Sequence, residues 1–292
     1  MPGTVSREKM DAPFSPAASS PTDGGELFVD MMSQPSRACC YFAHLARLPV
    51  TRRRVILGKK EQRATTYPNP LKQVPCLVER DGFVLPESSA ILKYLADRHT
   101  VADHWYPREL RARARVNAAL DWHHFSLRRG AAGVTWFSLI ARNMGMKTDP
   151  GMARAMLGVL KGALGTLEAT WLTDDAPFMM GSSRPCVADL LVAEVRNNND
   201  DDPFRVVFLT LVAQLHSVVH QEIFNLTLLE AIDEDFGMPP TLDALLGEGH
   251  PRVTKFLAAC QDLDFDEWRS IHGVLHTARD KMAARKKTRS RM

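Results

Sequence analysis

The chain has 292 residues, of which 45% are hydrophobic and 24% charged, a balance typical of a water-soluble globular protein, and no apolar run approaches the ~20 residues that cross a bilayer. Its net charge of +3 is unevenly distributed: seven Lys and Arg residues and one Asp lie from Arg279 onward, so the rest of the chain is slightly acidic. A slightly acidic body with a basic tail argues against a nucleic-acid-binding surface. The five cysteines are odd in number and form no C-x-x-C pair, which argues against a disulfide framework or a thiolate metal site and indicates a reducing compartment.

The first 25 residues are rich in Pro, Ser, Ala and Gly and show no periodicity. We therefore expect a disordered extension over residues 1–25. The same stretch contains acidic residues and no apolar core, which argues against a secretory signal. We expect ordered structure to begin at Glu26.

Residues 26–103 predict one α/β unit with the element order β-α-β-β-α. The alternating ELFVDM suits a strand, and Ser33 and Pro35 then supply a hydroxyl N-cap and a first-turn proline for a helix. Asp81-Gly82 predicts the turn of a hairpin. The expected elements are a strand at 26–31, a helix at 36–47, a strand at 52–57, an irregular link at 58–70, a hairpin at 76–85 and a helix at 87–99.

From Arg108 onward the periodicity is helical, and we expect an all-α domain over 108–280 with Pro107 at the N1 position of its first helix. Residues 196–229 interrupt this domain with a polar, acidic run followed by an apolar stretch. Such an insertion would pack as an extra helix, contact a partner or be translated intron, and the sequence leaves these alternatives open. Residues 281–292 form a basic tail.

Ser33 stands at the first strand-to-helix junction, where free helix N–H groups and the positive end of the helix dipole favour an anion. The alternative is that its hydroxyl only caps the helix, because Ser is a favoured N-cap. Arg37, one turn later, would add positive potential on the same face, but we expect it to be a surface or interdomain arginine outside the site.

Two further pairs have possible binding chemistry. Val74-Pro75 enters a strand after an irregular loop and is a candidate cis peptide. A cis bond would turn the N–H and C=O of Val74 outward toward a peptide-like ligand. The alternative is an ordinary proline at the start of a strand. Glu87-Ser88 opens a helix, where a carboxylate suits the dipole and a hydroxyl can bind an anion, although first-turn helix chemistry explains the same residues. In a β-α-β-β-α fold, Ser33 and these two pairs converge at one end of the sheet.

Several segments in order carry a family resemblance. They are ELFVDMMSQPSRA, NPLKQVPCL, LPESSAILKYLA, VADHWYP, LDWHHFSLRRGAAG and FMMGSSRPCVADLLVAEV. Together they resemble the theta-class glutathione S-transferases, and the plant members most. The resemblance implies a thioredoxin-like N-terminal domain followed by an all-helical C-terminal domain, usually assembled as a homodimer.

The resemblance also implies roles for individual residues. Ser33 matches the serine that hydrogen-bonds the glutathione sulfur, and Val74 before Pro75 matches the cis-proline site that pairs with the cysteinyl unit. Glu87 and Ser88 match the pair that holds the γ-glutamyl end. Gln73 matches a position near the glycyl carboxylate, and Arg128 matches an arginine that faces the electrophile in some members.

The sequence departs from the family pattern in two places. Gln62 falls where theta members usually have a His on the glycyl carboxylate, and Lys59 or Lys60 would have to substitute for that cation. In CVAD, Cys186 replaces the hydroxyl of an S/T-x-x-D capping box while Asp189 remains, so half of the reciprocal capping should be lost.

The resemblance implies an enzyme that stabilises the glutathione thiolate and conjugates it to small hydrophobic electrophiles or reduces organic hydroperoxides. It implies glutathione as co-substrate, no other cofactor and no metal; His123-His124 are adjacent on a helix and cannot share one ion. The alternative is a catalytically weak, glutathione-binding module. The last residues, Ser290-Arg291-Met292, favour a peroxisomal address, with the cytoplasm as the alternative.

Overall fold

The computed structural model describes residues 25–137, 141, 146–147, 149–193, 250–263, 266–267 and 270. The expected N-terminal extension, apart from Gly25, lies outside these residues. So do the insertion at 196–229, the basic tail at 281–292 and the C-terminal tripeptide that it ends on.

A four-stranded mixed sheet forms the first half of the molecule. Its strands are β1 (Glu26–Val29), β2 (Thr51–Arg54), β3 (Cys76–Val78) and β4 (Val84–Pro86), in the order β2-β1-β3-β4. β1 pairs with β2 in parallel, because a helix connects them, and with β3 antiparallel. β3 pairs with β4 antiparallel, because the hairpin turn at Asp81-Gly82 connects these two strands. Gly82 in this turn has a φ of 90°, a backbone conformation that glycine adopts readily and residues with a side chain rarely adopt. This topology confirms the predicted thioredoxin-like half.

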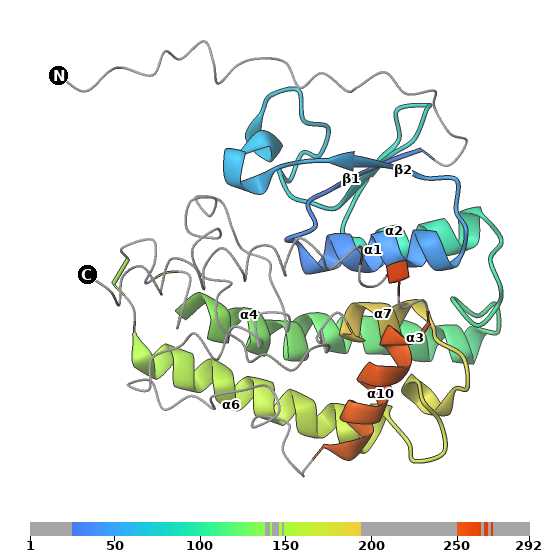
Figure 1. Ribbon diagram of the computed structural model, residues 1–292, viewed down its shortest axis with the longest axis vertical. Helices are drawn as coiled ribbons and strands as arrows, with labels where there is room; N and C mark the ends of the chain where they lie inside the picture. Colours follow the sequence, from blue (N-terminus) through green and yellow to red (C-terminus); the bar gives the residue numbers. More distant parts are fainter. Residues whose placement is uncertain are drawn as a thin grey trace.

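Helices α1 (Gln34–Leu45) and α2 (Ser88–Arg98) lie together on one face of the sheet (Figure 1). Ten consecutive residues of α1, from Gln34 to Ala43, are buried. An amphipathic surface helix would bury only one stripe, so α1 has the sheet on one side and further protein on the other. The helix begins and ends two residues earlier than expected, with Pro35 in its first turn.

The other face of the sheet is covered by the connection between β2 and β3. This segment contains 3-10 turns at Leu57–Lys59 and Glu61–Arg63 and lies above the sheet in Figure 1. A small apolar cluster fills the space beneath it, where the ring of Tyr67 meets that of Phe28 edge-on at a centroid distance of 5.9 Å. The link expected to be irregular is therefore a packed layer.

The second half is helical. Its elements are α3 (Leu110–Trp122), a π-helical turn (His123–Arg128), α4 (Arg129–Thr135), α6 (Pro150–Thr166), a second π-helical turn (Leu167–Trp171), α7 (Val187–Ala193) and α10 (Pro251–Gln261). Gly130 lets α4 approach α6 closely, because a Cβ at this position would lie 2.6 Å from the backbone nitrogen of Leu160. In the part of the chain that the structure describes, no helix has the length and apolarity to cross a membrane.

The prediction of Pro107 at N1 of the first helix of this half is wrong. α3 begins at Leu110 because the carboxylate of Glu109 accepts hydrogen bonds from the backbone N–H groups of Arg111 and Ala112, at 2.9 and 2.7 Å. These are the unpaired N–H groups of the first turn, and a carboxylate N-cap satisfies them. Pro107 lies in the preceding link, and its carbonyl accepts from Nε of Arg113 in α3 at 2.6 Å.

The helical half docks on the buried side of α1. The side-chain amide of Gln34 donates to the backbone carbonyl of Leu191 in α7 at 2.7 Å, and the hydroxyl of Tyr41 donates to the carbonyl of Cys260 in α10 at 3.4 Å. One apolar cluster runs through α1, α2 and the helical half. All five cysteines lie among the described residues; they are buried and form no disulfide there.

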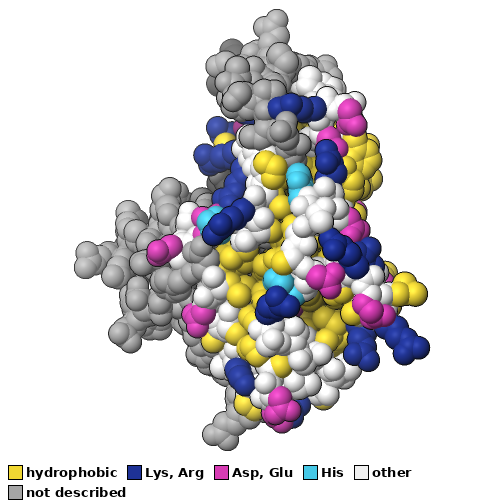
Figure 2. Space-filling model, turned by 90° about the vertical axis from the view of Figure 1, so that its right-hand side faces the viewer, with side chains coloured by type: hydrophobic (Ala, Val, Ile, Leu, Met, Phe, Trp, Pro, Cys, Tyr) yellow, Lys and Arg dark blue, Asp and Glu magenta, His cyan; other side chains and the backbone are white. Residues whose placement is uncertain are grey.

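On the face drawn in Figure 2, Lys and Arg side chains are interspersed with Asp and Glu side chains. Among the described residues of this face, neither sign therefore forms a large continuous field of the kind that the phosphate backbone of a nucleic acid attracts.

Asp189 caps the start of α7, although Cys186 replaces the Ser or Thr hydroxyl with which it would form a complete capping box. Its two carboxylate oxygens accept from the backbone N–H groups of Met179 and Cys186, at 2.8 and 2.7 Å. The carboxylate is completely buried, and this burial raises its pKa against the lowering effect of those hydrogen bonds. The carboxylate half of the capping box is therefore intact, and it also fastens the segment before α7.

We expect Asp189→Ala to lower the free energy of unfolding by about 2–4 kcal/mol, because it leaves two buried N–H groups without acceptors. Urea unfolding followed by circular dichroism measures the change. Asp175→Ala, which removes an exposed carboxylate nearby in sequence, serves as the control and should change stability little. Equal stability of the two variants would contradict the capping role.

Candidate functional site

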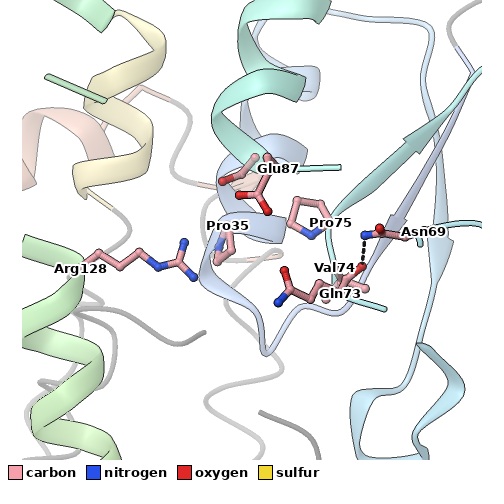
Figure 3. Close-up of a pocket in the computed structure, with 8 residues that line it drawn as sticks. Pro35, Asn69, Gln73, Val74, Pro75, Glu87 and Arg128 are labelled. Atoms are coloured by element: carbon pink, nitrogen blue, oxygen red, sulfur yellow. Dashed lines mark hydrogen bonds between the residues drawn. The ribbon is translucent and has the colours of Figure 1, made fainter. Parts of the chain in front are cut away.

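A cavity lies where the thioredoxin-like half meets the helical half (Figure 3). The space between its lining atoms, together with the part that is open to solvent, amounts to about 290 Å³. The residues that line it are Pro35, Asn69, Gln73, Val74, Pro75, Glu87, Ser88 and Arg128. The start of α1, the loop before β3 and the start of α2 thus meet at one place, as the β-α-β-β-α order predicts.

The Val74-Pro75 peptide bond is cis, which confirms the expectation from the sequence. The preceding carbonyl, that of Gln73, accepts hydrogen bonds from the hydroxyl of Tyr67 at 2.9 Å and from the amide of Asn69 at 2.8 Å. Burial raises the pKa of Tyr67, so this hydroxyl stays a neutral donor. The loop is therefore anchored from behind and presents Val74 to the cavity (Figure 3).

Asn69 is a site residue that sequence reasoning did not single out. It is completely buried, lines the cavity and also accepts from the backbone N–H of Leu71 at 2.8 Å. Its only signal in the sequence is its place in NPLKQVPCL, one of the segments that carries the resemblance. Its part in holding the Gln73 carbonyl depends on the path of a loop, which a sequence pattern does not give.

Glu87 and Ser88 lie at the N-terminus of α2. Glu87 is the N-cap residue and has a φ of 70°, a left-handed conformation that costs a residue with a side chain of order 1 kcal/mol or more. Ser88 is buried and lines the cavity together with Glu87. Backbone strain at a cavity is typical of a functional position, and here it aims a carboxylate and a helix N-terminus at the same space.

Arg128 comes from the opposite side of the cavity. It ends the π-helical turn after α3, and its side chain extends from the helical half toward the start of α1 (Figure 3). π-helical turns often occur at functional sites. Burial lowers the pKa of Arg128 to about 10, and the charge of Glu87 acts in the opposite direction. The guanidinium is thus cationic at neutral pH, and the cavity has a carboxylate and a cation on facing sides.

Ser33 occupies the N-cap position of α1, but its side chain makes no capping hydrogen bond. Only 1% of its surface is exposed, and its Oγ has no hydrogen-bond partner among the described residues. A buried hydroxyl without a partner loses about 1–3 kcal/mol of hydrogen bonding. Ser33 does not itself line the cavity, whereas Pro35 in the same turn does. Capping therefore does not account for this hydroxyl, and its proposed catalytic role stays a prediction.

Of the two expectations for Arg37, the surface position is wrong, and the interdomain position stays a prediction. Its side chain is completely buried, and Nη1 donates to the backbone carbonyls of Met31 and Met32, at 2.9 and 3.3 Å. Both carbonyls belong to the loop that leads to Ser33. Arg37 therefore lies behind the start of α1 and supports it.

Gln62 does not line the cavity. It is buried in the second 3-10 turn of the layer between β2 and β3. Lys59 and Lys60 are exposed, also outside the lining. The structure thus does not bring together the loop residues that were expected near a glycyl carboxylate, apart from Gln73.

His123 and His124 differ in their surroundings. His123 is buried, and its burial, assisted by the charge of Arg128, lowers its pKa to about 3. His124 is exposed. Within the described residues, no three His, Cys, Asp or Glu side chains are grouped to hold a metal ion.

We expect His123 to make the protein less stable in acid. In the unfolded chain the His123 imidazole takes up a proton near pH 6.5, whereas in the folded state it does so only near pH 3. The free energy of unfolding therefore falls as the pH drops from 6.5 toward 3. The loss is about 1.4 kcal/mol per pH unit well inside this window. Urea unfolding between pH 7 and pH 5 measures it.

His123→Gln should flatten this part of the stability profile. An unchanged slope in His123→Gln would contradict the assignment.

Comparisons with known proteins agree with this geometry. Residues 35–98 match the family model described as "Glutathione S-transferase, N-terminal domain". The chain is 41% identical over 206 residues to glutathione S-transferase T1 of Arabidopsis thaliana, covering 68% of this chain and 82% of that protein. It is 39% identical over 175 residues to glutathione S-transferase T2 of the same plant, covering 58% of this chain but only 29% of that longer protein.

Among solved structures, the fold is similar to that of human glutathione transferase theta-2, crystallised with glutathione and an unknown ligand. The TM-score is 0.68 at 27% sequence identity, and the match covers 90% of this chain and 91% of the human chain.

Proposed function

The chain belongs to the theta class of the glutathione S-transferases, and on this premise we propose that it binds glutathione in the cavity and transfers the glutathione sulfur to a small electrophile. The observation that carries the proposal is the buried Ser33 hydroxyl, which lacks a hydrogen-bond partner among the described residues at the start of a helix beside the cavity. A thiolate is an acceptor that this hydroxyl and the helix dipole would both favour.

The charges of the cavity suit a zwitterionic peptide. Glutathione has an ammonium and a carboxylate at its γ-glutamyl end, and the cavity offers the Glu87 carboxylate beside the hydroxyl and N-terminal helix position of Ser88. The backbone of Val74 would pair with the cysteinyl unit, since the cis peptide follows it directly. Gln73 would lie toward the glycyl end. Arg128 approaches from the helical half, where an electrophile would enter.

The energetics are sufficient without a protein nucleophile. A free thiol has a pKa near 8.5, and lowering it by about 2 units requires about 2.7 kcal/mol of preferential thiolate stabilisation. A hydrogen bond from a hydroxyl to a charged acceptor contributes about 1.5–3 kcal/mol, and a helix N-terminus about 0.3–1 kcal/mol. Ser33 and α1 together therefore supply the amount needed.

In the transfer itself, the thiolate lone pair forms a C–S bond to the electrophilic carbon while the leaving group departs with its bonding pair. With an organic hydroperoxide, the thiolate attacks the terminal oxygen, the O–O bond breaks, and the alkoxide takes a proton to give the alcohol. A second glutathione then attacks the oxidised sulfur, and glutathione disulfide and water are the products. Neither route requires a second catalytic side chain.

We also propose that the chain pairs with a second copy of itself. Leu71 and Phe83 are large apolar side chains of the thioredoxin-like half that remain 52% and 42% exposed. The ring of Phe83 lies against that of Tyr94, with centroids 5.4 Å apart. Fixed and exposed aromatic groups are typical of contact surfaces. Light scattering should give twice the mass of the chain, and Phe83→Glu should shift the mass toward that of one chain.

We expect Ser33→Ala to lower kcat/KM for a benzyl halide about 10- to 100-fold at pH 6.5, since it removes a charge-assisted hydrogen bond worth about 1.5–3 kcal/mol. The loss should shrink near pH 9, where free glutathione is itself ionised. Ser36→Ala, which removes another fully buried hydroxyl from the same helical turn, is the matched comparison and should have the smaller effect. Equal activity of Ser33→Ala and the wild type would refute the role of Ser33.

We expect Ser88→Ala to weaken glutathione binding about 5- to 50-fold, as the loss of a hydrogen bond to a carboxylate predicts, with little effect on kcat. Calorimetric titration with glutathione measures the affinity. The neighbour Ser89 does not line the cavity, so Ser89→Ala should bind as the wild type does. Binding by the wild type with no turnover of any halide or hydroperoxide would instead support the non-catalytic binding module.

A further inference from the structure

One carbonyl oxygen at the cavity is held by two side chains at once. The carbonyl of Gln73 accepts from the hydroxyl of Tyr67 at 2.9 Å and from Nδ2 of Asn69 at 2.8 Å. A carbonyl oxygen has two lone pairs, so these two donors use its full capacity. Donors that converge from two different side chains fix the direction of a carbonyl more firmly than a single donor does.

The direction of this carbonyl sets the direction of the Val74 N–H. Both groups belong to the peptide unit that joins Gln73 to Val74, which is planar and trans. In such a unit the N–H points opposite to the C=O. Val74 lines the cavity, and no group of the described residues accepts from its N–H. The two side chains therefore hold one side of a peptide unit whose other side has a donor left for a ligand.

Asn69 also closes the loop in which it lies. Its Oδ1 accepts from the N–H of Leu71 at 2.8 Å, and its backbone carbonyl accepts from the N–H of Lys72 at 3.0 Å. The side chain is completely buried and lines the cavity (Figure 3). Both ends of the amide are used, one as donor and one as acceptor, and an ionised Asp or a Leu of the same size could not do both.

Tyr67 reaches the same carbonyl from the layer between β2 and β3. Its ring is buried and meets the ring of Phe28 in β1 edge-on, with centroids 5.9 Å apart. Packing of a rigid ring against the sheet thus places the hydroxyl. The peptide unit after Gln73 is therefore fixed both to the sheet, through Tyr67, and to its own loop, through Asn69.

We propose that Asn69 and Tyr67 are positioning residues for glutathione, which act through the peptide unit between Gln73 and Val74 and set the affinity for the cysteinyl part of the ligand. The inference rests on the proposed function, because it assumes that the Val74 backbone pairs with glutathione. Such a pairing is equally strong before and during the transfer, so its loss should raise KM and leave kcat unchanged. Loss of a thiolate-stabilising group would lower kcat instead.

Three variants remove the two donors separately. Tyr67→Phe keeps the ring and removes the hydroxyl. Asn69→Leu and Asn69→Asp keep the size of the side chain and remove the amide donor; Asp keeps an acceptor for Leu71, and Leu adds no charge. Tyr106→Phe is the matched control, because it removes another buried tyrosine hydroxyl, which donates to Oδ1 of Asn117 at 3.1 Å outside the cavity lining.

The probe is glutathione itself, titrated calorimetrically, with kcat and KM measured for its reaction with a benzyl halide. We expect the Kd for glutathione to rise about 3- to 10-fold in Tyr67→Phe and about 5- to 20-fold in both Asn69 variants, since each loses a hydrogen bond that orients the peptide unit. The kcat at saturating glutathione should stay as in the wild type, and Tyr106→Phe should bind as the wild type does.

A wild-type Kd in Tyr67→Phe and Asn69→Leu would overturn the inference, as would a lower kcat beside an unchanged Kd. If the Asn69 variants do not fold, Tyr67→Phe decides on the same criterion. A wild type that binds no glutathione would refute the proposed function and the inference together, whereas a wild type that binds it beside unaffected variants would refute the inference alone.

The double variant Tyr67→Phe/Asn69→Leu tests whether the two donors act on one peptide unit. Its rise in Kd should exceed the product of the two single effects, because in each single variant the remaining donor still holds the carbonyl. A rise equal to the product would contradict joint positioning.

Discussion

The burial of α1 on all sides is the constraint on which the rest of the structure depends. The sheet covers one side of this helix and the helical half covers the other, so that every residue from Gln34 to Ala43 is buried. A helix enclosed in this way cannot shift along its axis without breaking both contacts. Its N-terminus therefore has a fixed place at the junction of the two halves, and that is where the cavity lies.

The same enclosure explains the unusual polar groups at the start of α1. Ser33, Gln34, Ser36 and Arg37 are all buried, although such residues normally lie at the surface. Gln34 uses its amide to bind α7, and Arg37 uses its guanidinium to hold the loop from β1. The hydroxyls of Ser33 and Ser36 have no hydrogen-bond partner among the described residues, and that of Ser33 stands at the N-cap position of α1. The proposed thiolate would complete this cluster.

The cavity is built from backbone geometry as much as from side chains. The cis bond before Pro75, the left-handed Glu87 and the π-helical turn that ends at Arg128 each depart from regular structure, and each brings a functional group to the same space. A left-handed backbone such as that of Glu87 persists when the surrounding structure over-determines it. Here Tyr67 and Asn69 hold the Gln73 carbonyl from behind, and α2 continues directly from Glu87.

The sequence by itself determined the element order, the family and the convergence of Ser33, Val74-Pro75 and Glu87-Ser88, because these follow from local patterns and from motifs in a fixed order. It misplaced the start of α3, since Pro107 and Glu109 both suit a helix start and only the geometry selects the carboxylate cap. It also allowed a surface position for Arg37, which is buried, and did not single out Asn69. Burial and the path of a loop decided those two, and both are properties of tertiary packing, which no local pattern records.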